Sequence, residues 1–198
     1  MRSSLTARNT TPLQNRVLPT GDIVAIPARG TLTGNRGIIH GPDRVLGAAR
    51  WSHHAWICCT LDWQGRQRDV MTGRKWTELF FLDEAFAFAA GHRPCGYCRR
   101  PAYRDFVAAW GETPSAKAMD KALHKARGIP RQRIQQTYRE DIRNLPAGAF
   151  VLWNGAPHLV RQKTLHRYTP DGYLVPARRQ ATGDVTVLTP QPTVTALT

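Results

Sequence analysis

The sequence predicts an α+β fold with short strands first, helices in the middle and antiparallel strands at the end. Apolar residues recur at helical spacing between residues 83 and 127, which is typical of amphipathic helices. On both sides of this region they occur in short runs separated by Gly, Pro and Asn turns, which indicates strands. A chain of 198 residues is long enough for one hydrophobic core. We expect a flexible basic arm over 1–17 and a single compact domain over 18–198.

Short apolar runs predict strands in the first part of the domain. These runs cover residues 23–27, 38–40, 55–63 and 78–82. Between the first two, three glycines over residues 30–37 predict tight turns, whose backbone N–H groups can bind a phosphate. The Gln64-Gly65 turn predicts a hairpin that returns through Val70 and Met71.

Three segments predict helices. Asp83 is a typical N-cap, and Gly91 ends the helix that we expect over 84–90. A second helix is expected over 101–110, starting at Pro101, and a third over 115–127. The charged segment 131–144 is compatible with a loop or a short helix.

After Pro146 the hydrophobic period changes to two. The runs 150–153 and 158–161 flank Asn154-Gly155, which is a strong signal for a hairpin. A second hairpin is expected over 165–175 and a last strand over 185–188.

The charge of the chain indicates a polyanionic partner. It contains 28 Lys and Arg but only 14 Asp and Glu, which gives a formal net charge of +14. Solubility of a small domain needs a net charge of only about 2–8. Nucleic acid is therefore the first expectation and anionic lipid the second. No apolar run is long enough for a membrane helix, so we expect no membrane partner and a cytoplasmic location, near the nucleoid in a bacterium. No protein partner can be inferred from the sequence.

Four cysteines carry the strongest chemical pattern. Cys95 and Cys98 form a C-x-x-C pair, and such a pair of thiolates can bind one tetrahedral Zn²⁺. Cys59 is the preferred third ligand because alternation in a strand places it on the opposite face from Cys58. His40, before a rigid Gly-Pro, is preferred as the fourth. The other candidates for that position are His53, His54, His92 and Cys58.

The segment 90–98, Ala-Gly-His-Arg-Pro-Cys-Gly-Tyr-Cys, resembles the zinc-binding domain of the Ada DNA-repair protein family. The resemblance covers residues 83–100 and implies a structural Zn²⁺ held by Cys95 and Cys98 beside a DNA-backbone contact surface. In the family the first two cysteines are four residues apart and one accepts a methyl group, whereas Cys58 and Cys59 are adjacent. The expected parts of the domain are then a zinc-binding part over about 21–112, a helical and Arg-rich part over 113–145 and a β-hairpin part over 146–198.

Two other interpretations of the C-x-x-C pair are open. The pair matches half of the zinc-deaminase signature, but no His-x-Glu or Cys-x-Glu precedes it. A thioredoxin-like redox pair would open a helix after a strand, whereas this pair follows a predicted helix. A closed zinc site that only stabilises the fold is the plainest interpretation.

Basic residues are expected to bind the phosphates of the nucleic acid. Aromatic residues such as Trp76 and Tyr97 alternate with them and can stack on exposed bases. The predicted contacts are Arg29, Arg36, Lys75, Arg99, Arg100, Arg131, Arg133 and Arg139.

Candidate catalytic residues are scattered along the chain. Asp120 and His124 are spaced i, i+4 on the expected polar face of the third helix, where a carboxylate can orient an imidazole. Glu78 and Asn35 can hold a water molecule. These groups suit base excision by a DNA glycosylase that flips a modified base out of the duplex. The alternatives are a non-enzymatic DNA-binding regulator or architectural module, and an RNA-binding protein.

Overall fold

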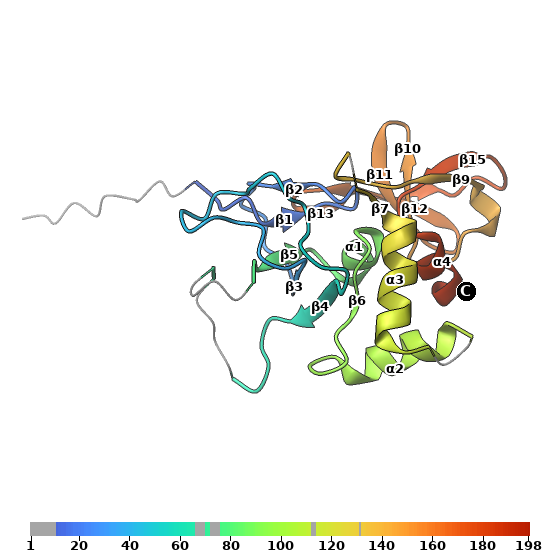
Figure 1. Cartoon of the computed structure of the whole chain (residues 1–198). Helices are drawn as coiled ribbons and strands as arrows, with labels where there is room; N and C mark the ends of the chain where they lie inside the picture. The colour runs from blue at the N-terminus through green and yellow to red at the C-terminus, as the bar shows by residue number, and fades with distance from the viewer. Residues whose placement is uncertain (1–10, 66–69, 72–75, 112–113, 131) are drawn as a thin grey trace, which may run out of the picture.

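The fold is α+β, as the sequence predicts. The computed structural model describes residues 11–65, 70–71, 76–111, 114–130 and 132–198. Within them a mixed sheet lies at the N-terminal side, helices occupy the middle and an antiparallel sheet follows (Figure 1). Across the same residues, no helix combines the length and the apolar character needed to cross a membrane.

The N-terminal sheet has six strands within the described residues, in the order β2-β1-β5-β3-β4-β6. The strands are β1 (Arg16–Val17), β2 (Ile23–Val24), β3 (Leu32–Asn35), β4 (Ile57–Thr60), β5 (Leu79–Phe81) and β6 (Arg93–Pro94). The expected arm over 1–17 is too long, because β1 pairs with β2 and β5 and Val17 is buried. The run 38–40 was expected to be a strand, but His40 forms only an isolated bridge with Leu46.

Strand β3 lies where the sequence predicts only turns. It pairs with β4 and β5, so it occupies the middle of the sheet. Gly34 is required there because a Cβ atom at this position would lie 2.3 Å from the backbone oxygen of Ile57. Glycine in this strand therefore marks a close approach between backbones. The hairpin expected from Gln64-Gly65 involves residues outside the described ranges.

The three predicted helices are present; the first begins at the expected cap, and the second begins at Arg100, one residue before the expected Pro101. Asp83 accepts a hydrogen bond from Phe86 N at 3.0 Å and caps one helix, and Ser115 caps another. The helices are α1 (Glu84–Ala89), α2 (Arg100–Ala109) and α3 (Ala116–Arg127). The sequence analysis missed a fourth helix, α4 (Gln191–Leu197), which packs against α2 and α3.

The C-terminal sheet is antiparallel, and both predicted hairpins are confirmed. Asn154 and Gly155 adopt positive φ angles of 48° and 74°, as a tight two-residue turn requires. The segment 131–144, expected to be a loop or short helix, instead contributes strands and one 3-10 turn. The elements are β7 (Gly128–Ile129), β8 (Ile134–Gln135), β9 (Tyr138–Asp141), η1 (Ile142–Asn144), β10 (Phe150–Trp153), β11 (Ala156–Val160), β12 (Thr164–Thr169), β13 (Gly172–Tyr173), β14 (Ala177–Arg178) and β15 (Asp184–Val187).

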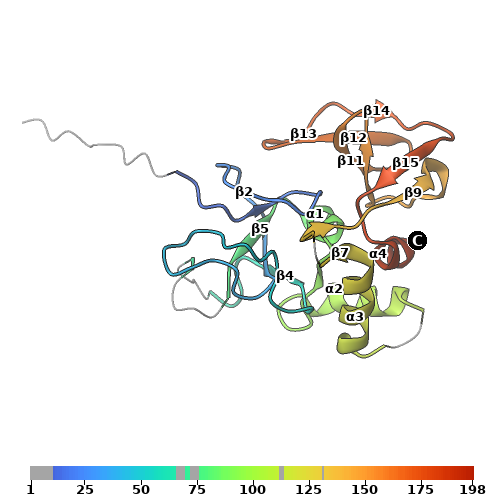
Figure 2. The same ribbon diagram turned by 45° about the horizontal axis from the view of Figure 1, so that its top comes forward.

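Helix α1 lies between the two sheets and joins their cores (Figure 2). The ring of Phe86 contacts Phe150 of the C-terminal sheet edge-on, with ring centres 5.2 Å apart. Tyr173 donates a hydrogen bond of 2.7 Å to Asp83, the residue that caps α1. The same carboxylate thus caps the start of α1 and holds the C-terminal hairpin against it.

Candidate metal centre

Strand β4 places two adjacent cysteines on opposite faces of the N-terminal sheet. Cys58 is fully buried in the core beneath α1. Its sulfur accepts a hydrogen bond of 3.1 Å from Arg99, and burial raises the pKa of the Cys58 thiol. Cys59 faces the other way, toward a cavity. Cys59, and not Cys58, therefore belongs to the cysteine group that could hold a metal ion.

Strand β6 and the turn after it bring the C-x-x-C pair to Cys59. β6 runs parallel to β4, and Cys95 N donates a hydrogen bond of 3.0 Å to Cys58 O. The chain then turns, with Tyr97 N donating to the Cys95 sulfur at 3.4 Å. This turn returns Cys98 to the same place, one residue before Arg99 caps α2.

Three sulfur atoms meet at this point. The Sγ atoms of Cys59, Cys95 and Cys98 all lie within 4.8 Å of one another. Tetrahedral zinc with Zn–S bonds near 2.3 Å needs sulfur atoms about 3.8 Å apart, so only a small adjustment is required. The Cys59 thiol donates to the Cys95 sulfur, which lowers the pKa of Cys95 and raises that of Cys59. The cluster can therefore hold a metal ion.

The three thiols line a cavity of about 620 Å³ that is rich in aromatic rings. Trp63 and Tyr97 lie with ring centres 5.4 Å apart, and Trp76 and Phe80 also line the cavity. Within the described chain, the buried indole nitrogen of Trp63 has no hydrogen-bond partner. A metal at the thiols would therefore face a cavity instead of being sealed in the core.

Two of the predicted catalytic residues line the same cavity. Glu78 lies before β5 and accepts a hydrogen bond of 2.7 Å from Met71 N. Asn35 ends β3, and its side-chain oxygen accepts from Gly37 N and contacts a ring nitrogen of His53 at 3.0 Å. The sequence analysis missed Asp62, which also lines the cavity. Its position three residues after the predicted ligand Cys59 was the one feature of the sequence that could have placed it near the site.

His40 was the expected fourth metal ligand, and this expectation is wrong. Its Nε2 lies 2.9 Å from Gln14 O, and its Nδ1 lies 3.3 Å from the hydroxyl of Thr77. Among the described residues, the metal-ligand cluster contains three cysteines and no histidine. The error arose because the predicted strand 38–40 does not form beside β4.

Asp120 and His124 do not form the expected acid–base pair. Asp120 is buried, not on a polar face, and its two oxygens bind Arg93 at 2.8 and 2.9 Å. His124 instead stacks on His54, with ring centres 3.8 Å apart. Neither residue lines the thiol cavity.

The predicted nucleic-acid contacts divide into several groups. Arg36 was expected to present a surface guanidinium, but it is only 2% exposed. Arg99 bridges Cys58 and Glu84, the latter at 2.6 Å, so it holds α1 against the sheet. Lys75 and Arg131 lie outside the described residues. The remaining predicted contacts are exposed: Arg29, Arg100, Arg133 and Arg139. Of these, Arg133 donates a hydrogen bond of 2.9 Å to Ala48 O, and Arg139 donates one of 3.2 Å to Asp184 O.

Comparison with protein-family models, with curated proteins and with solved structures finds no match to this chain.

Proposed function

We propose that the chain is a zinc-containing DNA-binding protein that takes a modified base into the thiol cavity and excises it. The observation that carries this proposal is the shared cavity. Three thiols, several aromatic rings and two side chains that can hold water all line one space of about 620 Å³. This volume lies within the range of roughly 300–1,000 Å³ that is usual for small-molecule sites.

Zinc is the metal that best suits the donor set. Thiolates are soft ligands, and a group of three favours zinc over magnesium or calcium, which prefer oxygen. Cys59, Cys95 and Cys98 would hold the ion and so connect β4 to the turn before α2. Once bound, the zinc would supply a Lewis acid at one wall of the cavity, where the three thiolates outweigh its charge.

The aromatic side chains support a flat ligand. Nucleobases stack on aromatic rings with a gain of about 1–3 kcal/mol per base. Trp63, Trp76 and Tyr97 provide such surfaces, and Tyr97 is 64% exposed, so it lies at the mouth. The Trp63 indole N–H is a buried donor that a carbonyl oxygen of a base would satisfy.

Glu78 is the proposed general base for the excision. In base excision, the oxygen of a water molecule bonds to C1′ of the sugar as the bond from C1′ to the base breaks. The electron pair of that bond leaves with the base. The Glu78 carboxylate takes a proton from the water, and the departing base acquires a proton in turn. Asn35 lies beside Glu78, because Gly34 of β3 pairs with Leu79 of β5, and it would orient the same water.

A basic groove on the C-terminal sheet supports DNA as the substrate. The groove has a volume of about 810 Å³, and its charged lining consists of Arg143, Lys163, Arg178 and Arg179. No carboxylate is among its lining residues in the described chain. A surface of this kind binds phosphates and releases counterions without reading sequence.

The test is excision from duplexes that each carry one modified base, read as abasic sites. We expect abasic sites with the zinc-loaded protein and a fall of about 100-fold or more in the Glu78→Gln variant. Asp171→Asn, in an exposed turn, is the matched control and should retain activity.

Tight DNA binding without abasic sites across a broad panel would contradict excision and would favour a DNA-binding regulator. Preference for single-stranded RNA over duplex DNA in competition would contradict DNA as the partner.

A further inference from the structure

A second cavity lies near α3 and contains several cationic side chains. Its volume is about 230 Å³, which is below the usual range for drug-sized ligands, so it suits a small group. Four arginines line it, together with the rings of Trp51 and Trp56. These arginines are Arg36, Arg50, Arg127 and Arg133.

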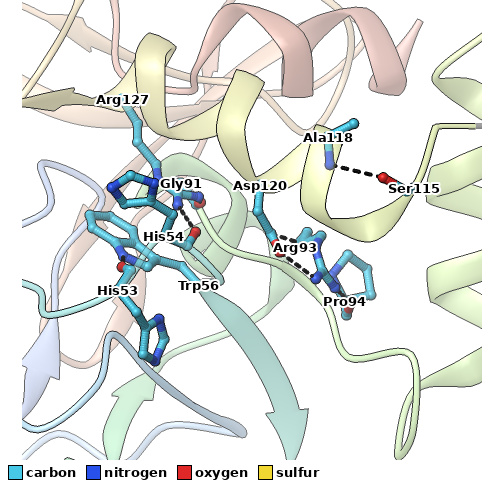
Figure 3. Close-up of polar contacts among 10 residues, drawn as sticks. All are labelled: His53, His54, Trp56, Gly91, Arg93, Pro94, Ser115, Ala118, Asp120 and Arg127. Carbon is cyan, nitrogen blue, oxygen red and sulfur yellow. Dashed lines mark hydrogen bonds and ion pairs between the residues drawn. The ribbon is translucent and has the colours of Figure 1, made fainter.

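Two of these arginines are buried and rigidly held. Arg36 donates to Gly21 O at 3.2 Å and to Ala90 O at 3.3 Å. Arg127 is fully buried and donates to the carbonyls of Gly91 and His54 (Figure 3). Their guanidinium carbons lie 4.1 and 4.0 Å from the ring centre of Trp56.

The protein offsets the charges of Arg36 and Arg127 only in part. Asp22 acts on Arg36 and Asp120 acts on Arg127 without forming an ion pair. Among the described residues, no carboxylate forms an ion pair with either one, and the Nε–H of each has no acceptor. Asp120 is bound by Arg93. The acid that lines the cavity is Asp22, which is exposed and accepts a hydrogen bond from the hydroxyl of Thr20.

Burial of two such charges is strongly unfavourable without an anion. Burial lowers the pKa of Arg36 to about 9, and burial together with the charge of Arg36 lowers that of Arg127 further. Arginine is not deprotonated in proteins, so these shifts express how poorly the site tolerates the positive charges. Aromatic contact offsets only part of such a penalty.

We propose that this cavity binds a phosphate group, as a free anion or at the end of a nucleic acid strand. Arg50 and Arg133 are more exposed and line a space of suitable size, and Arg36 and Arg127 place buried positive charge at its wall. Guanidinium groups match the oxygen atoms of phosphate in geometry and charge.

The cavity is separate from the thiol site, so this inference does not rest on the proposed excision. Asn35 lines the thiol cavity and the next residue, Arg36, lines the arginine cavity. Likewise, Ile57 lines the thiol cavity and the preceding residue, Trp56, lines the arginine cavity. Adjacent side chains in extended backbone point to opposite faces, and the two cavities therefore open on opposite sides of β3 and β4.

The test uses calorimetric titration with inorganic phosphate at constant ionic strength, with chloride as the reference salt. We expect the full chain to bind phosphate and the Arg133→Gln variant to bind it about tenfold more weakly, because one charged hydrogen bond is lost. Arg36→Met should abolish binding, and if that variant fails to fold, Arg133→Gln decides alone. Arg104→Gln, exposed on α2, is the matched control and should bind phosphate like the native chain.

Oligonucleotides with and without a 5′-phosphate then distinguish the sources. If the 5′-phosphate raises the affinity for the oligonucleotide, and Arg133→Gln removes this increase, the ligand is the end of a strand. Equal binding of the two oligonucleotides, with inorganic phosphate still bound, identifies a free phosphate. Absence of phosphate binding in the native chain, or wild-type affinity in the variants that fold, would overturn the proposal.

Discussion

His92 illustrates how burial alone makes a residue sensitive to acid. It is fully buried against Phe81 and Trp56, with ring centres 4.6 and 5.3 Å away. Burial depresses the pKa of His92 well below the ordinary value, and nearby Arg36 adds to this effect. The folded state therefore excludes a proton that the unfolded state binds below about pH 6.5. The stability that depends on neutral His92 is full above that pH and decreases as the pH falls.

The His92→Phe variant tests this effect. Phenylalanine suits the apolar surroundings, so we expect the free energy of unfolding at pH 7 to rise by about 1 kcal/mol. Unfolding at pH 5 should take up about one proton fewer than in the native chain. Denaturant titrations at both pH values measure the two effects. An unchanged dependence of stability on pH would contradict this account of His92.

Asp120 provides a second prediction at the scale of a residue. Its buried ion pair with Arg93 leaves both side chains less than 10% exposed, so removal of the carboxylate isolates a buried guanidinium. We expect Asp120→Ala to lower the free energy of unfolding by about 3 kcal/mol. Asp105→Ala, on the exposed side of α2, is the control and should change it by less than about 0.5 kcal/mol. Equal stability of the two variants in urea would contradict the role given to Asp120.

Residue chemistry was predictable where it depends on local spacing. Alternation in a strand favoured Cys59 over Cys58 as a metal ligand, and the C-x-x-C spacing predicted Cys95 and Cys98 as two further ligands. Asp120 and His40 were misassigned because their partners, Arg93 and Gln14, lie 27 and 26 residues away. A local pattern contains no information about such contacts.

Strand β3 is the element on which the metal centre depends. It pairs with β4 over four residues, from Leu32 opposite Thr60 to Asn35 opposite Ile57. The pairing fixes Cys59 relative to the cavity, and it tolerates no side chain at Gly34.

The Gly34→Ala variant should therefore separate β3 from β4. A Cβ would lie 2.3 Å from Ile57 O and 2.9 Å from the ring of Phe81, and neither neighbour is a flexible side-chain end. We expect a loss of about 2 kcal/mol or more in stability together with weaker zinc binding. Gly96→Ala is the control, because its Cβ would meet Tyr103 only at an ordinary distance of 3.4 Å. Retention of native stability in Gly34→Ala would contradict the assigned register.

The helices were easier to predict than the N-terminal strands. Asp83, Ser115 and the apolar spacing identify three helices from local signals. Strands of two residues, such as β1 and β6, carry almost no sequence pattern, since their pairing is decided by distant segments. The C-terminal hairpins were found because their turns are local.

At the scale of the molecule, the net charge of +14 is the reason why we propose a polyanionic partner. In the structure, some of the basic residues are bound within the protein and others are exposed. Arg93, Arg99 and Arg127 form contacts within the protein, whereas Lys163 and Arg178 in the groove on the C-terminal sheet are exposed. Sequence counts alone cannot separate these groups, because the difference lies in burial.

The groove predicts how salt affects DNA binding. Each phosphate contact contributes a slope of about −0.9 to the logarithm of affinity against the logarithm of salt concentration. Replacement of Lys163 or Arg178 by Gln should reduce the slope by about 1 for each residue. Fluorescence anisotropy with duplex DNA at several salt concentrations measures it, and Lys117→Gln on α3 is the control. An affinity that does not change with salt would contradict the role of the groove.

The central claim is that Cys59, Cys95 and Cys98 bind zinc at the wall of a cavity. Metal analysis of the purified chain tests it most directly, with Cys59→Ser compared against Cys58→Ala. The account predicts one zinc per native chain, the same content in Cys58→Ala and a large loss in Cys59→Ser. A native chain without zinc, or equal zinc in Cys59→Ser and the native chain, would contradict it.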